Sequence, residues 1–188
     1  TDITRTYPLG ELTEDERKFY TWTLQCHIDI AKAVWLDYCD CHMIDTIARE
    51  PLWRHLINYR CGTGHSVSFV GNVHEGPHAL NGRNTTLMRP GMIVTDEPGV
   101  YETDLVGIRI ENELVCVHKA DNQYGTFLGF EPIMFVPIAT SPIVPGVLTK
   151  DELDWLNNYH RQVFEKLAPR LNDEEREWLA KKCAAIGC

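Results

Sequence analysis

The sequence predicts an α+β fold, because its helical and β-branched segments are separated along the chain instead of alternating. Helical spacing of apolar residues dominates residues 13–58, β-branched runs dominate residues 89–138, and helical signals return after residue 149. Hydrophobic residues make up 44% of the 188 residues and charged residues 24%, which is typical of a folded globular domain.

The first third of the chain predicts one strand and two helices. Residues 1–9 are rich in β-branched side chains and predict a strand. Thr13 followed by Glu16 predicts a capping box, and apolar residues at helical spacing extend this helix to about residue 36. The same spacing predicts a second helix over residues 42–58.

The remaining elements follow from local patterns. Residues 89–102 form a β-branched run between two Pro-Gly turns, and residues 107–119 alternate as a half-buried strand does. Residues 127–138 predict another strand, whose prolines favour the edge of a sheet. Thr149 begins a second capping box and a helix, and residues 172–184 predict the last helix.

Composition excludes several classes of protein. A net charge of −9 argues against a basic surface that binds nucleic acid. No apolar run approaches the ~20 residues that a membrane helix needs. The polar opening TDITRT is no signal peptide and is typical of the interior of a longer protein. We therefore expect a cytoplasmic protein in which the seven cysteines are reduced thiols.

Cys39, Cys41 and His42 suggest a zinc site at first sight. The sequence offers no second ligand pair at the spacing of a zinc ribbon. Ordinary packing of these residues is therefore the favoured interpretation.

Four acidic or imidazole side chains lie close to turns and strand ends: Asp2, His65, Glu97 and Glu111. Carboxylates beside apolar segments are costly unless they are paired, and a metal ion is a suitable partner. A mixed oxygen and nitrogen set suits Mn²⁺, Co²⁺ or Zn²⁺. Taken singly, each residue also has a structural explanation, such as a turn cap for Asp2, solvation for Glu97 or pairing with Arg109 for Glu111.

Several segments together resemble one known family. They are DITRT (2–6), GTGHSVSFVGNVHEGP (62–77), TDEPGVYE (95–102), GIRIEN (107–112), FEP (130–132) and DWLNNYH (154–160). These segments resemble the pita-bread metallopeptidases, and in particular the Xaa-Pro aminopeptidase (aminopeptidase P) branch of the eukaryotic cytosolic type.

The resemblance implies a partial pita-bread fold that lacks its N-terminal portion. Residues 1–148 would be the C-terminal part of the catalytic domain, and residues 149–188 a helical extension packed on it. It also implies a homodimer for the full-length protein, with the C-terminal helices taking part in the contact.

The resemblance further implies two divalent metal ions, with Mn²⁺ expected and Zn²⁺ or Co²⁺ as alternatives. Asp2, His65, Glu97 and Glu111 match four of the family's five metal ligands. The first aspartate of the family would fall before residue 1, so the site is incomplete in this chain. We therefore expect these 188 residues by themselves to be inactive.

The implied reaction removes the N-terminal residue from peptides that carry proline in second position, by attack of a metal-bridging hydroxide. Glu97 would handle the proton of the water, and His74 would contact the substrate and hydrogen-bond the tetrahedral intermediate. Arg109 would support the last glutamate and the substrate site. Cys61 stands where relatives carry a substrate-contacting histidine, and Ser66 replaces a usual glycine; a thiol is a poorer hydrogen-bond donor than an imidazole.

Two other functions remain open. A prolidase, which cleaves Xaa-Pro dipeptides, has similar motifs, although NVHEGP and DWLNNYH favour the aminopeptidase. A non-catalytic peptide-binding module is the alternative outside the enzymes, and the four retained ligands argue against it.

Overall fold

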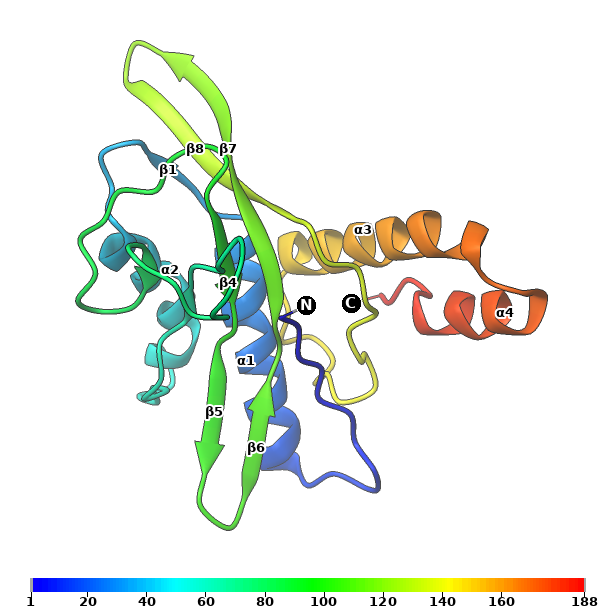
Figure 1. The fold of residues 1–188 in the computed structure, drawn as a ribbon. Helices are drawn as coiled ribbons and strands as arrows, with labels where there is room; N and C mark the ends of the chain where they lie inside the picture. Colours follow the sequence, from blue (N-terminus) through cyan, green and yellow to red (C-terminus); the bar gives the residue numbers. More distant parts are fainter. Residues whose placement is uncertain (1, 188) are drawn as a thin grey trace.

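The computed structural model describes residues 2–187, and within them helices and strands follow the predicted α+β order (Figure 1). The helices are α1 (Glu14–Ala31), α2 (Cys41–Trp53), α3 (Lys150–Leu167) and α4 (Asp173–Lys182), with a 3₁₀ turn, η1 (Ala168–Arg170), between the last two. The strands are β1 (Val34–Leu36), β2 (Gly64–His65), β3 (Ala79–Leu80), β4 (Ile93–Asp96), β5 (Gly99–Glu102), β6 (Val106–Arg109), β7 (Asn112–Asn122) and β8 (Gly125–Pro132).

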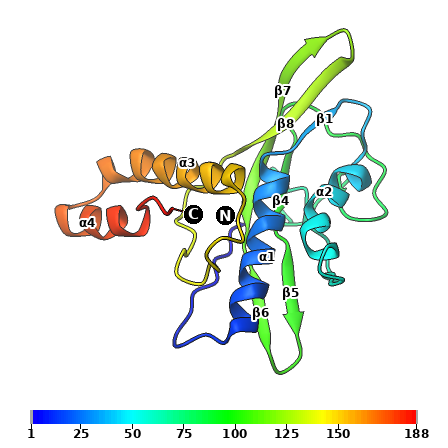
Figure 2. The ribbon, with the colours of Figure 1, turned by 180° about the vertical axis from the view of Figure 1, so that it is seen from behind.

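The main sheet is antiparallel and has the strand order β1-β8-β7-β4. Two small antiparallel pairs, β2 with β3 and β5 with β6, accompany it. Helix α1 lies along one face of the strands, with α2 beside it, and the β7–β8 hairpin extends beyond the body of the fold (Figure 2). Helices α3 and α4 lie antiparallel and project away from the sheet (Figure 1).

Two buried apolar clusters hold these layers together. The first joins α1 and α2 to the main sheet and includes Ile44, Leu114 and Leu128. The second joins α1 to β6 and α3 and includes Leu24 and Leu156. Each fully buried side chain of this size contributes about 1.5–3 kcal/mol, so the helices and the sheet stabilise one another.

The three helix starts that sequence patterns predict are confirmed. The hydroxyl groups of Thr13 and Thr149 accept hydrogen bonds from the backbone N–H groups three residues on. In each case the glutamate at that position accepts a hydrogen bond from the backbone N–H of the threonine. Asn172 does the same at the start of α4. These side chains satisfy N–H groups that have no partner within the helix.

The predicted ends of the first two helices are wrong by about five residues each. Helix α1 ends at Ala31, because Val34–Leu36 pairs with β8 as strand β1. Helix α2 ends at Trp53, and Leu56 has φ = 59°, a left-handed conformation that cannot continue a helix.

The strand predictions need three corrections. Residues 107–119 belong to two strands, because β6 ends at Arg109 and β7 begins at Asn112. Strand β8 ends at Pro132 and lies inside the sheet between β1 and β7, so its prolines do not mark an edge. Residues 2–8 form no strand; residue 1 lies outside the described residues.

None of the helices within residues 2–187 combines the length and hydrophobicity required to cross a bilayer.

Buried His160 on α3 provides a test of how the C-terminal helices are held. Its Nε2 accepts a hydrogen bond from the Ile138 backbone N–H at 3.1 Å, and its side chain is fully buried. Burial lowers the pKa of His160 to about 4, and the charge of Arg5 acts in the same direction. Between about pH 6.5 and pH 4 the unfolded chain therefore binds a proton that the folded chain excludes.

We predict that His160 lowers the free energy of unfolding by about 3 kcal/mol as the pH decreases through this window, taken as the difference between the wild type and His160→Gln, since each pKa unit corresponds to about 1.4 kcal/mol. The measurement is the urea midpoint of the full-length protein that contains this chain, recorded between pH 4 and 7. His160→Gln, which keeps an acceptor for Ile138, should remove this loss of stability, whereas exposed His118→Gln should not. Equal slopes in all three proteins would contradict the assignment.

Candidate metal centre

His65 is positioned by a close crossing of β2 over β4. Its backbone N–H donates to Thr95 Oγ1 at 2.9 Å, and Ser66 bridges Val94. A Cβ atom on Gly64 would lie 1.7 Å from the Thr95 carbonyl oxygen, so only glycine permits this approach. The crossing places the imidazole directly beside the end of β4, where Glu97 follows.

Three predicted ligands converge at this point. His65 Nε2 lies 3.1 Å from Glu97 Oε1 and 3.3 Å from Asp2 Oδ2. Such separations are those of neighbouring donor atoms around one ion with bonds of about 2.0–2.2 Å. The structure therefore brings together side chains that are 95 residues apart in the sequence.

Glu97 is fixed from three directions. Its backbone N–H donates to the Thr63 carbonyl at 2.7 Å, and Thr95 Oγ1 donates to Oε1 at 2.8 Å. Arg109 Nη1 binds Oε2 at 2.8 Å. The carboxylate is thus oriented on both oxygens, and its bond to the Arg109 guanidinium is charge-assisted.

Glu111 lies in the break between β6 and β7, and its side chain is 3% exposed. The Thr4 hydroxyl donates to its Oε2, and its backbone N–H donates to the Thr4 carbonyl at 3.0 Å. Burial raises the pKa of Glu111 to about 7; the charges of Glu97 and Asp2 add to the increase, while the Thr4 hydrogen bond opposes it. A cation among these carboxylates would relieve both the burial and the repulsion.

The predicted substrate-contacting residues surround this cluster. The His74 ring packs against the His65 ring at an interplanar angle of 52°, with centroids 3.8 Å apart. Cys61 Sγ lies 3.6 Å from the Gly99 carbonyl oxygen and faces the Arg109 guanidinium. The predicted site residues therefore come together, although their roles in binding and catalysis stay predictions.

The donor set fits a divalent cation. Asp2 Oδ2 is buried and has no hydrogen-bond partner in the described part of the chain. Within residues 2–187, no three His, Cys, Asp or Glu side chains form a ready cage for an ion; Glu97 is bound to Arg109 and Glu111 to Thr4. His65, Asp2, Glu97 and Glu111 are the residues that would hold the ion, with Glu97 and Glu111 released from these contacts.

The cysteine-rich segment 39–42 has a different environment. Cys41 is fully buried in the first apolar cluster, and Cys39 packs against that cluster. Burial raises the pKa of Cys41 to about 11, so its thiol is neutral at physiological pH. Both side chains serve as apolar packing residues.

A helix-and-sheet fold that gathers one histidine and three carboxylates is typical of a metalloprotein with oxygen and nitrogen ligands. Residues 1–118 match metallopeptidase family M24, and residues 126–186 match the C-terminal region of peptidase M24. The chain belongs to metallopeptidase family M24.

Similar sequences carry names within this family. The chain is 42% identical over 194 residues to aminopeptidase P1 of Lotus japonicus, covering 100% of this chain and 29% of that protein. It is 43% identical over 186 residues to aminopeptidase P2 of Arabidopsis thaliana, covering 95% and 26%. The chain thus spans less than a third of the length of these relatives.

Solved structures agree on the fold. The X-prolyl aminopeptidase of Caenorhabditis elegans, a cytosolic enzyme with a di-nuclear active site, matches with a TM-score of 0.91 and 35% identity, over 99% of this chain and 31% of that one. Prolidase from Pyrococcus furiosus matches with a TM-score of 0.58 and 26% identity, over 69% and 35%. The predicted partial pita-bread fold is confirmed.

Sequence reasoning missed the residues that position the ligands. Thr95 joins the His65 backbone to the Glu97 carboxylate, and Thr4 holds Glu111. Asp96 is buried 2.9 Å from His27 of α1, which anchors the end of β4. The DITRT and TDEPGVYE segments contain three of these residues, but only the fold reveals their partners.

The glycine at the β2–β4 crossing can be tested against a neighbour. We predict that Gly64→Ala destabilises the protein by about 3 kcal/mol, because the new Cβ collides with backbone. Gly62→Ala is the matched control, since its Cβ would lie 3.5 Å from the nearest atom, which is ordinary contact. The measurement is the unfolding midpoint of both variants in the full-length protein. Equal midpoints would contradict the close approach of Gly64 to the backbone of Thr95.

Proposed function

We propose that the protein containing this chain is a metal-dependent aminopeptidase that removes the N-terminal residue from peptides with proline in second position. The observation that carries the proposal is the convergence of His65, Asp2 and Glu97 beside buried Glu111, in a chain of family M24. The names of its relatives support the substrate class.

The C-terminal region favours an aminopeptidase over a prolidase. The aminopeptidase structure covers 99% of this chain, whereas the prolidase structure covers 69%. Residues 126–186 also match the C-terminal region of the family. The DWLNNYH segment lies within this region, on α3.

The proposed reaction assigns separate tasks to the residues around the cluster. Two divalent ions, Mn²⁺ in our proposal, would activate a water molecule and polarise the scissile carbonyl when bound. Glu97 would take up the proton of that water, and Thr95 and Arg109 hold its oxygens in place for this role. His74 donates a hydrogen bond to the oxygen that gains charge in the transition state.

Cys61 and Arg109 form the side of the substrate site in this proposal. The Arg109 guanidinium lies 5.6 Å from the Tyr101 ring centroid and binds Glu97, so its position is fixed. The Cys61 thiol leaves more space than the imidazole of relatives and donates a weaker hydrogen bond. We expect a cytoplasmic homodimer, to which α3 and α4 contribute contacts.

The first experiment is Mn²⁺-dependent hydrolysis of Ala-Pro-Ala by the full-length protein, with metal removal by a chelator. We predict that His65→Ala lowers kcat/KM at least about a hundredfold, because the ligand set loses its nitrogen donor. His118→Ala is the matched control, since His118 is exposed on the β7–β8 hairpin and pairs with Asp121.

Three results separate the alternatives. Metal-dependent cleavage of the tripeptide that is lost only in His65→Ala supports the aminopeptidase. Cleavage of Ala-Pro alone would indicate a prolidase. Absence of hydrolysis with any divalent metal, from a folded protein that still binds the peptide, would indicate a non-catalytic binding module.

A further inference from the structure

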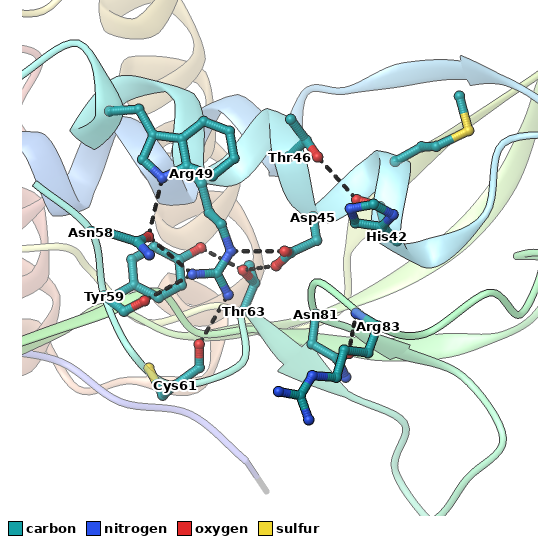
Figure 3. Close-up of polar contacts among 12 residues, drawn as sticks. His42, Asp45, Thr46, Arg49, Asn58, Tyr59, Cys61, Thr63, Asn81 and Arg83 are labelled. Atoms are coloured by element: carbon teal, nitrogen blue, oxygen red, sulfur yellow. Dashed lines mark hydrogen bonds and ion pairs between the residues drawn. The ribbon is translucent and has the colours of Figure 1, made fainter. Parts of the chain in front are cut away.

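A cleft with a volume of about 730 Å³ opens beside the Tyr59–Thr63 segment (Figure 3), which leads along the chain to the candidate ligand His65. Helix α2 forms one wall, and the loop after β3 forms another. Its lining side chains include His42, Asp45, Arg49, Arg60, Cys61 and Arg83.

The Arg49 side chain lines the cleft and is bound to neighbouring groups of the protein. Its guanidinium binds Asp45 Oδ2 at 2.7 Å and donates to Asn58 Oδ1 and to the carbonyl oxygens of Tyr59 and Cys61 at 2.8–3.1 Å (Figure 3). Four of its five N–H groups are thus occupied. Asp45 is neutralised by the same contact, so neither residue contributes a free charge to the cleft.

Arg60 and Arg83 give the cleft its net charge. Both are exposed, and neither has a carboxylate partner among the described residues. Asp45 is the carboxylate that lines the cleft in this part of the chain, and Arg49 already neutralises it. The cleft therefore carries an excess of two positive charges in a chain whose net charge is −9.

Cys61 connects this cleft to the metal centre. Its carbonyl oxygen accepts from Arg49 on the cleft side, while its thiol faces Gly99 and Arg109 on the other side. Cys61 is four residues from His65, and Arg60 is five, so their backbones lie at most about 14–17 Å from that of the candidate ligand.

We propose that Arg60 and Arg83 bind a carboxylate on the C-terminal side of the peptide substrate. This inference rests on the proposed function. An aminopeptidase holds one residue before the scissile bond, so the part of the substrate that can extend this far is the leaving peptide. At about 3.3–3.6 Å per extended residue, this limit places the carboxylate within about five residues of the scissile bond.

Guanidinium groups suit this task, because their planar fork matches a carboxylate. Two sources of carboxylate are available in a short peptide: an acidic side chain and the free C-terminus. The test compares Ala-Pro-Ala-Asp-amide with Ala-Pro-Ala-Asn-amide for the side chain, and Ala-Pro-Ala-Asn with its amide for the C-terminus.

We predict that the full-length protein cleaves at least one carboxylate-bearing peptide about fivefold more efficiently in kcat/KM than its neutral counterpart, mainly through KM. This ratio should fall towards one in Arg60→Gln, Arg83→Gln and the double variant, and also in 0.5 M salt. Arg161→Gln is the matched control, because Arg161 is exposed on α3 and pairs with Glu165; it should leave the ratio unchanged.

The outcomes separate this inference from the proposed function. Cleavage of all three peptides at equal efficiency would overturn the carboxylate site and leave the aminopeptidase intact. A ratio that persists in the double variant would also overturn it. If no peptide is cleaved, calorimetric binding of the Asp and Asn peptides to the wild type and the double variant decides the inference independently.

Discussion

The guanidinium of Arg5 is the contact on which the arrangement of the candidate metal centre depends. It donates to partners from four separate segments: the carbonyl oxygens of Thr4, Glu111, Val136 and Pro137, Asn112 Oδ1 and the Tyr159 hydroxyl. These groups come from the N-terminal segment, from the start of β7, from the chain after β8 and from α3. One planar cation therefore fixes the relative positions of four segments.

Side-chain hydrogen bonds in the same N-terminal segment explain why residues 2–8 lie along the protein without forming a strand. Thr6 exchanges hydrogen bonds with the backbone of Arg109 through its hydroxyl group, and Thr4 pairs with the backbone of Glu111. Side chains thus replace much of the backbone ladder that a strand would use. The result places Asp2 within ion-pair distance of His65 and keeps Thr4 on the Glu111 carboxylate.

Structural features that depend on neighbouring residues could be predicted from the sequence, whereas features that depend on contacts between distant residues could not. The capping boxes at Thr13 and Thr149 are local and were predicted fully. The apolar residues of β1 satisfy a helical spacing equally well, and only pairing with β8 decides between the two structures. The ligand candidates could be recognised by their motifs, whereas the part played by Arg5 requires contacts across more than 100 residues.

Helix α3 is consequently part of the framework of the site. Its Tyr159 hydroxyl accepts from Arg5, and its His160 accepts from the backbone of Ile138, in the segment that also supplies carbonyl acceptors to Arg5. Trp155 stacks on the Tyr159 ring at 5.3 Å and also touches His27, the partner of Asp96. A substitution in α3 that moves Tyr159 would therefore be transmitted through Arg5 to Glu111, although α3 contributes no ligand of its own. This chain of contacts gives the DWLNNYH segment a physical reason to accompany the candidate ligand motifs in one protein.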